Sequence, residues 1–213
     1  MGFYSRIIFP RLLNLSMASE QLAAYRRSLL AHVQGEILEI GFGTGLNLPY
    51  YPEHVQRITA IDVNPGMHPL AQRRMATSGI EVTLYPHSIE SLPMPDHSFD
   101  TVVSSWTLCS VRQLTAALQE IRRILKPEGH FCLIEHGLSP DPKAQWWQYR
   151  LNPVQQLLGD GCQLTRNFQD LLPEQGFTWI ELEKFDLPDT PRFLGYMYQG
   201  VAQPKALDSD QQS

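Results

Sequence analysis

Apolar positions in the middle of the chain follow two alternating periodicities. Helices are expected near 66–78 and 112–125. The second stretch places apolar residues at helical spacing, and Pro127 and Gly129 end it. A shorter helix is expected near 45–51. Short apolar runs predict buried strands near 36–40, 57–62, 80–85, 99–105 and 129–136. Strands and helices in turn, joined by short links, predict a parallel sheet covered by helices on both faces, the α/β class.

The two ends of the chain differ from this middle. Residues 1–34 carry apolar positions at helical spacing from Tyr4 to Leu15, then a helix from Ser19, a good N-cap, to His32. We expect this segment to form a helical lid on the sheet. The pattern breaks from Gly137 to Asn167. A helix near 167–175 follows, then an antiparallel pair of strands near 177–185 and 193–202, and residues 203–213 are expected to be a disordered tail.

A glycine-rich turn follows the first predicted strand. Gly41, Gly43 and Gly45 alternate there, and glycine lets a backbone turn sharply and lie against a ligand. A dinucleotide fingerprint needs its third glycine at Leu46, and Glu39 in the strand would repel a pyrophosphate. Asp62 ends the next strand, where an acid accepts both hydroxyls of a ribose. An adenosyl ligand with an ammonium and a sulfonium, and without phosphates, satisfies these features.

Composition narrows the class of protein. The 213 residues suit one domain, and the 43% hydrophobic and 18% charged content is that of a soluble globular protein. A net charge of -5 gives no basic footprint for nucleic acid. No apolar run reaches the length of a membrane span, and no secretory signal is evident. We therefore expect a cytoplasmic protein, with peripheral membrane contact as the alternative because arginines flank the N-terminal apolar faces.

The three cysteines, Cys109, Cys132 and Cys162, are far apart in sequence. They form neither a C-x-x-C pair nor a disulfide framework, so reduced thiols and no metal site are expected.

Several motifs together resemble one enzyme family. Glu39 to Gly45 reads E-I-G-F-G-T-G, and Ile61 to Met67 reads I-D-V-N-P-G-M. S-F-D-T-V-V from Ser98 and I-R-R-I-L-K-P-E-G-H from Ile121 continue the pattern. Residues 35 to 136 thus resemble the class I S-adenosylmethionine-dependent methyltransferases. The resemblance implies a Rossmann-like three-layer α/β/α sandwich over 35–202, with a mostly parallel seven-stranded sheet whose last strand is antiparallel.

The resemblance also implies which residues bind the cofactor. Ser88 stands where an acid commonly faces adenine, so adenine recognition falls to the Ser88 hydroxyl, to the backbone at Ile89 or to His87. Glu39 either contacts the methionine amino group through water or braces the loop. The implied cofactor-binding residues are Glu39, Gly41, Phe42, Gly43, Thr44, Gly45, Asn47, Asp62, Val63, Asn64, Met67, His87, Ser88, Ile89, Ser104, Ser105 and Trp106.

His136 ends the fifth predicted strand and is the candidate general base, because its ordinary pKa lies near neutrality. The alternative is a histidine that is simply hydrogen-bonded in a loop. The sulfonium is already activated, so the protein must chiefly align the acceptor and exclude water.

Three further runs, Leu108–Val111, Ile134–His136 and Asp160–Arg166, are similar to those of the methyltransferase-like 7 group of alkyl thiol methyltransferases. The membrane-bound animal members carry a hydrophobic N-terminal anchor that this sequence lacks. The similarity implies a small, apolar acceptor such as a thiol. It places Asp160, Cys162, Thr165 and Arg166 on a loop capping the active site, with Cys162 in a glycine-flanked polar turn that fixes the lid.

Three alternatives stay open at this point: a phosphatidylethanolamine-type N-methyltransferase, a non-catalytic S-adenosylmethionine-binding module, and a nicotinamide dehydrogenase, which Leu46 disfavours. The oligomeric state is not predicted.

Overall fold

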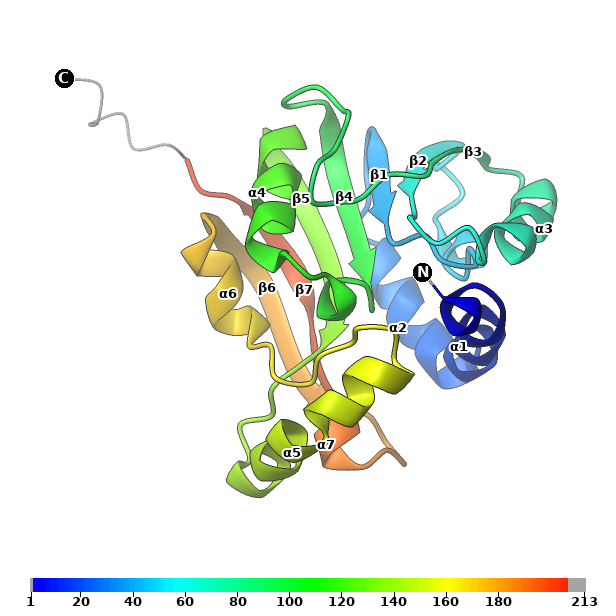
Figure 1. The fold of residues 1–213 in the computed structure, drawn as a ribbon. Helices are drawn as coiled ribbons and strands as arrows, with labels where there is room; N and C mark the ends of the chain where they lie inside the picture. Colours follow the sequence, from blue (N-terminus) through cyan, green and yellow to red (C-terminus); the bar gives the residue numbers. More distant parts are fainter. Residues whose placement is uncertain (1, 207–213) are drawn as a thin grey trace.

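The computed structural model describes residues 2–206, which fold around one seven-stranded sheet (Figure 1). The strands are β1 Ile37–Ile40, β2 Arg57–Ile61, β3 Glu81–Tyr85, β4 Phe99–Ser105, β5 Leu125–His136, β6 Phe177–Asp186 and β7 Tyr196–Pro204. Their order is β3-β2-β1-β4-β5-β7-β6. The first five strands pair in parallel, and β7 lies antiparallel between β5 and β6. The predicted sheet, with its antiparallel last strand, is confirmed.

Helices cover both faces of this sheet. The Ser19 side chain accepts a hydrogen bond from the Leu22 amide and caps the second helix, as predicted. The helices are α1 Phe9–Met17, α2 Glu20–Leu30, α3 His68–Ser78, α4 Leu114–Ile124, α5 Pro142–Leu158, α6 Phe168–Glu174 and α7 Arg192–Gly195. A π-helical turn, Tyr4–Ile8, precedes α1, and short 3₁₀ turns lie at Leu48–Tyr50 and Leu108–Ser110.

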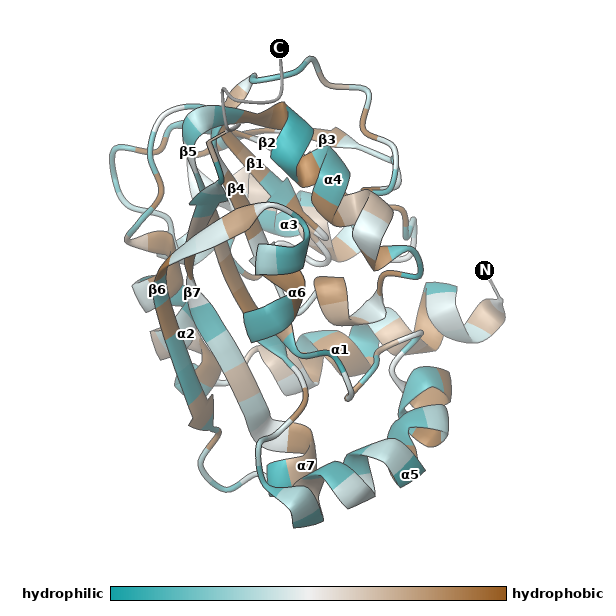
Figure 2. Cartoon of the chain, turned by 90° about the vertical axis from the view of Figure 1, so that its left-hand side faces the viewer, coloured by the Kyte–Doolittle hydropathy of each residue, from teal (hydrophilic) through white to brown (hydrophobic). Residues whose placement is uncertain are grey.

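Two apolar cores, one on each face of the sheet, hold the layers together. Strand β5 serves both, because successive side chains of a strand point to opposite faces. Phe131 packs with Ile121 of α4 and Phe168 of α6, whereas Ile134 packs on the other face with Leu30 of α2. Figure 2 shows hydrophobic residues concentrated along the strands between the helices. Full burial of each of these large side chains stabilises the folded state by about 2 kcal/mol.

Two predicted elements are wrong. The helix expected near 45–51 is only the turn Leu48–Tyr50, because Gly45 before it has a φ of +76°, which no right-handed helix accepts. The supposed break at 137–167 contains α5, whose first turn is capped by the Asp141 carboxylate. This helix turns many of its apolar residues outward, so the sequence shows no stripe facing a core. In addition, β5 begins four residues early and β7 reaches Pro204; residues 207–213 of the expected tail lie outside the described range.

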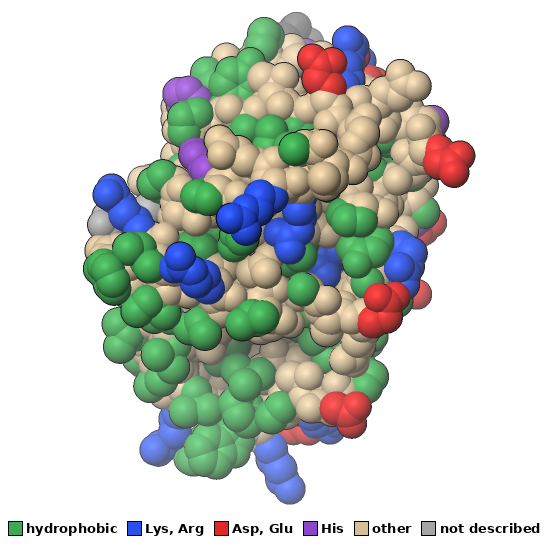
Figure 3. Space-filling view, turned by 90° about the vertical axis from the view of Figure 1, so that its right-hand side faces the viewer, with side chains coloured by type: hydrophobic (Ala, Val, Ile, Leu, Met, Phe, Trp, Pro, Cys, Tyr) green, Lys and Arg blue, Asp and Glu red, His purple; other side chains and the backbone are tan. Residues whose placement is uncertain are grey.

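An outer apolar surface lies over the N-terminal helices and α5. Its exposed residues are Phe3, Ile7, Ile8, Leu12, Leu15, Trp146, Trp147, Tyr149, Val154, Leu157 and Leu158. The two segments meet where the Tyr4 hydroxyl donates to the Leu158 carbonyl at 2.6 Å. Figure 3 shows hydrophobic side chains gathered on the lower part of this face, with Lys and Arg side chains around them. None of the described helices combines the length and the apolarity that crossing a bilayer requires.

Candidate active site

The glycine-rich turn lies where the strand order reverses, between β1 and its neighbours β2 and β4. Gly41, Gly43 and Gly45 all have positive φ, at +66°, +57° and +76°. A Cβ at Gly41 would collide with the Thr107 side chain, whereas a Cβ at Gly43 would meet nothing closer than the Gly41 carbonyl, at 3.7 Å. The turn therefore depends on glycine, and its Gly43 side is open to an approaching ligand.

Asp62 fixes this turn to the end of β2. One carboxylate oxygen accepts from the Gly43 amide at 2.6 Å and the other from the Asn64 amide at 2.7 Å. Burial raises the pKa of Asp62, and these two amides oppose the rise. Each oxygen uses one lone pair here and keeps another for a hydroxyl, as binding of a ribose requires.

Glu39 is buried beneath the turn and acts through two side chains. It accepts from the Asn47 amide and from the Tyr51 hydroxyl, both at 2.8 Å. Burial raises its pKa from 4.5 to about 7, against the effect of both hydrogen bonds. Asn47 also donates to the Ser105 hydroxyl at 2.9 Å, which ties the turn to the end of β4. Of the two alternatives for Glu39, these contacts match the bracing of the loop.

Three buried polar atoms beside the turn have no hydrogen-bond partner among residues 2–206: Arg26 Nε, Asn47 Oδ1 and Trp106 Nε1. The Arg26 guanidinium lies 4.8 Å from the centre of the Trp106 ring, and burial lowers its pKa to about 10. Trp106 holds a φ of +50°, a strained conformation for a bulky residue. Two of these three atoms are hydrogen-bond donors and Asn47 Oδ1 is an acceptor. They suit a ligand that offers both an acceptor and a donor, such as an amino-acid carboxylate and ammonium.

The N-terminal segment covers this region. Asn14 Oδ1 accepts from the Thr44 hydroxyl at 3.0 Å and from Arg74 at 2.7 Å. Asn64 Nδ2 donates to the Ser5 carbonyl at 2.8 Å. The covering segment is thus bonded to the loops after both β1 and β2.

The predicted adenine-side residues occupy varied positions at the ends of β2 and β3. Ile89 and Met67 are buried, whereas His87 and Ser88 have exposed side chains, as does Val63. Phe42 is buried in the core on the α2 side of the sheet. Adenine recognition by these residues stays a prediction.

Glu135 organises the opposite half of the site. Its buried carboxylate accepts from the Ser104 hydroxyl at 2.8 Å, so this serine is directed to Glu135. It also accepts from the Thr107 and Leu108 amides, both at 2.9 Å, and from the Cys109 amide at 3.2 Å. Burial raises its pKa against these four donors. One carboxylate of β5 thereby holds the turn that follows β4.

The Cys109, His136 and Cys162 side chains meet beside that turn. Their sulfur and nitrogen atoms all lie within 4.8 Å of one another, and Cys162 Sγ is 3.1 Å from His136 Nε2. All three residues are buried, at 2%, 8% and 7% exposure. Contact with Cys109 and His136 lowers the pKa of Cys162. Contact with Cys162, together with burial, raises the pKa of Cys109. Burial opposes protonation of His136, but the contact with Cys162 outweighs it and raises the pKa of the ring.

Comparison with known proteins places this geometry in a family. Residues 38–133 match the model of a methyltransferase domain. The chain is 31% identical over 195 residues to the human thiol S-methyltransferase TMT1A, covering 84% of this chain and 80% of the relative. The chain belongs to the S-adenosylmethionine-dependent methyltransferase family.

Solved structures agree on the fold. The YcgJ protein of Bacillus subtilis matches with a TM-score of 0.68 at 17% identity, covering 88% of this methyltransferase and 99% of that chain. The 1,6-didemethyltoxoflavin-N1-methyltransferase of Burkholderia thailandensis, with bound S-adenosylhomocysteine, matches with a TM-score of 0.65 at 19% identity over 93% and 84% of the two chains.

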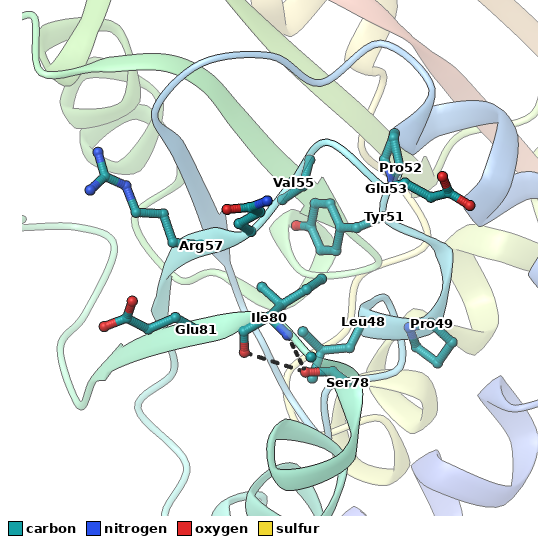
Figure 4. Close-up of a pocket in the computed structure, with 12 residues that line it drawn as sticks. Leu48, Pro49, Tyr51, Pro52, Glu53, Val55, Arg57, Ser78, Ile80 and Glu81 are labelled. Atoms are coloured by element: carbon teal, nitrogen blue, oxygen red, sulfur yellow. Dashed lines mark hydrogen bonds between the residues drawn. The ribbon is translucent and has the colours of Figure 1, made fainter.

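A cleft of about 760 Å³ lies elsewhere on the methyltransferase, at the amino ends of β2 and β3 (Figure 4). Residues such as Leu48, Arg57 and Glu81 line it, and the lining includes none of the predicted site residues. In open α/β sheets ligands bind beyond the carboxyl ends of the strands, so this cleft is at the wrong edge for the reaction.

Sequence reasoning missed several site residues. Asn14, Arg26, Tyr51 and Arg74 reach the cofactor side from helices and a loop whose packing no local pattern reveals. The prediction from sequence treated Cys109 and Cys162 as separate thiols because they are 53 positions apart. Such a separation does not prevent contact in the folded chain.

Proposed function

We propose that the protein transfers the methyl group of S-adenosyl-L-methionine to a small, apolar thiol. The observation that carries the proposal is the similarity to a thiol S-methyltransferase over most of both chains. The carboxyl edge of the sheet, where the glycine turn, Asp62 and Glu135 lie, supports it. When bound, the cofactor supplies an activated methyl group on a sulfonium, so the protein needs chiefly to bind, orient and exclude water.

The cofactor half is proposed to hold the ligand by its two polar ends. Asp62, through its remaining lone pairs, is assigned to the ribose hydroxyls. Arg26, Trp106 and Asn47, whose buried atoms lack partners within residues 2–206, are assigned to the carboxylate and ammonium of the methionine part. The open side of Gly43 leaves room for the ligand against the backbone.

Residues 1–34 act as a lid in this proposal. Hydrogen bonds of Ser5 and Asn14 to Asn64, Thr44 and Arg74 join the segment to both loops of the cofactor half. Such a cover excludes water from a sulfonium that would otherwise be hydrated, and its opening would precede exchange of the spent cofactor.

The acceptor half lies at the carboxyl ends of β4 and β5. Buried sulfur and imidazole groups line it, and the Glu135 carboxylate beside them is already satisfied by four donors. This environment favours a soft, apolar acceptor. The role of His136 as general base stays a prediction that a variant can test.

A methyl-transfer assay tests the function. Small alkyl thiols, amines, phenols and phospholipid vesicles are offered in turn, and released S-adenosylhomocysteine is measured. We expect release with thiols above all. Cofactor binding without release on any acceptor would instead identify a non-catalytic binding module.

A lipid amine is the second candidate acceptor, and the outer apolar surface favours it. Trp146, Trp147 and Leu157 on α5 and Leu12 and Leu15 on α1 are exposed and could rest on a bilayer, with Arg150 over the Trp146 ring. Release that requires phosphatidylethanolamine vesicles, with none on soluble thiols, would select this acceptor and peripheral membrane contact.

A further inference from the structure

We propose that Cys109, His136 and Cys162 form a zinc site with three protein ligands and an open fourth position. The inference departs from the sequence-based expectation of no metal site. Its use in catalysis rests on the proposed thiol methyltransferase function.

The ligand set and its spacing suit zinc. Two cysteines and one histidine with one open position are a known catalytic zinc arrangement, in which ligand atoms lie about 3.5 to 3.8 Å apart. Here Cys162 Sγ and His136 Nε2 are 3.1 Å apart, and no pair among the three exceeds 4.8 Å. Shifts of about 1 Å would thus complete the geometry. Two thiolates balance the charge of the ion, and sulfur ligands disfavour magnesium and calcium.

The three ligands come from different segments that hydrogen bonds hold together. Glu135, next to His136, accepts from the Cys109 amide. The Gln163 amide, next to Cys162, donates to the Cys109 carbonyl at 2.9 Å. The Gln155 side chain donates to Cys162 Sγ at 3.4 Å. Such outer contacts orient metal ligands, so the site is prepared by the fold and does not depend on chance proximity.

The site also lies within reach of the cofactor half. Thr107, two residues before Cys109, contacts the Gly41 carbonyl through its hydroxyl at 3.4 Å. His136 ends β5 beside the end of β4, since Ser105 pairs with Ile134. A metal held here would therefore border both the glycine turn and the place assigned to the acceptor.

The open position assigns zinc the task of activating the acceptor. A thiol that takes this position loses its proton to solvent and binds as the thiolate, which is the nucleophilic form. The thiolate sulfur then forms a bond to the methyl carbon as the bond from that carbon to the sulfonium breaks. The products are a thioether, which binds zinc weakly, and neutral S-adenosylhomocysteine. In this account His136 is a ligand in place of a base.

Metal content of the full chain tests the site directly. The protein is purified without chelators, under reducing and oxygen-free conditions, and analysed by mass spectrometry for metals. We expect about one zinc per chain. After removal of zinc, added Co²⁺ should give the charge-transfer absorption of cobalt bound by thiolate. Protein that holds no zinc and gives no such absorption overturns the proposal, and so does a Cys109–Cys162 disulfide that persists under these conditions.

Variants with a matched control sharpen the assignment. Cys162→Ser and His136→Gln should lower zinc content to below roughly a tenth of one per chain, since each removes a ligand. Cys132→Ser is the control, because Cys132 is equally buried but lies in the core on the α2 side of the sheet. It should keep its zinc. Equal loss in the control would mean that the metal is bound elsewhere, against the proposal.

Two further outcomes separate the site from the function. A chain stripped of zinc that methylates small thiols at the full rate, as judged by released S-adenosylhomocysteine, overturns zinc activation and leaves the proposed function standing. A chain that binds one zinc through these ligands yet methylates no thiol confirms the site and overturns the function.

Discussion

The cofactor half and the acceptor half of the site are built in different ways. The cofactor half is a main-chain construction. Three glycines of one short segment form a turn, and Asp62, 19 residues beyond Gly43, holds the turn by accepting from the Gly43 amide. The acceptor half is a side-chain construction. The Glu135 carboxylate of β5 holds the turn after β4, and the loop after α5 bonds to that turn through the Gln163 amide and the Cys109 carbonyl. The first kind is legible in a local motif, whereas the second emerges only from the fold.

The difference implies that the two halves fail separately. Loss of a cofactor-half side chain should remove binding, while loss of an acceptor-half side chain should remove turnover and leave binding in place.

The largest effect is expected from Asp62→Ala. The change removes the acceptor assigned to both ribose hydroxyls and frees the Gly43 and Asn64 amides. Hydrogen bonds to a charged group contribute about 1.5 to 3 kcal/mol each, so affinity for S-adenosylmethionine should fall by more than roughly 100-fold. Calorimetry measures it. Asp96→Ala is the control, since Asp96 is 66% exposed and pairs with Arg123. Near-normal affinity in Asp62→Ala would contradict the ribose assignment.

The next largest effect is expected from His136→Ala. Turnover on a thiol should fall roughly 100-fold, whether His136 takes the proton of the thiol as a general base or holds the proposed zinc that lowers the pKa of that thiol. The affinity for S-adenosylmethionine, measured by calorimetry, should stay close to that of the wild type because His136 lies in the other half. His32→Ala, at an exposed surface position, should change neither quantity. Unchanged turnover in His136→Ala would remove the histidine from the mechanism.

A smaller effect should appear in the pH dependence of stability. Burial raises the pKa of Glu39 from 4.5 to about 7, so the folded protein binds a proton there that the unfolded chain releases. Its contribution is fully present below about pH 4.5 and is lost as the pH rises to about 7. Glu39→Gln keeps an oxygen for Asn47 and does not titrate.

Compared with this variant, the wild type should lose up to about 3 kcal/mol of unfolding free energy across that window. Urea unfolding at a series of pH values measures the difference. Parallel stability curves for the two proteins would show that Glu39 is ionised equally in the folded and unfolded states.

The smallest effect is expected at the outer apolar surface. Leu157 is 76% exposed, so Leu157→Ser should change the free energy of unfolding by less than about 0.5 kcal/mol and leave thiol turnover intact. Sedimentation with phospholipid vesicles should show weaker association if this surface meets a bilayer. A fall in turnover on vesicle lipid, without a fall on thiols, would favour the lipid-amine acceptor.

Sequence patterns predicted the sheet and its order of elements because buried parallel strands read as apolar runs. The glycine turn and Asp62 were predicted equally well, since both belong to a local sequence motif. Helix α5 was not predicted, because its apolar residues face outward and give no core-facing stripe. The contact of Cys109 with Cys162 was not predicted either. It depends on the hydrogen bond of Glu135 to the turn after β4 and on the hydrogen bond of Gln163 to that same turn. Side chains that meet through tertiary packing leave no periodic trace in the chain.

The hydrogen bonds of Ser5, near the start of the chain, bear on how ligands would be released. Ser5 donates to Asp160 at 2.7 Å, on the loop that carries Cys162, and its carbonyl receives the Asn64 side chain of the cofactor loop. The N-terminal segment is therefore hydrogen-bonded to both halves of the site. If this segment is the proposed lid, we expect its opening to expose both halves at once, so that spent cofactor and methylated product are released together.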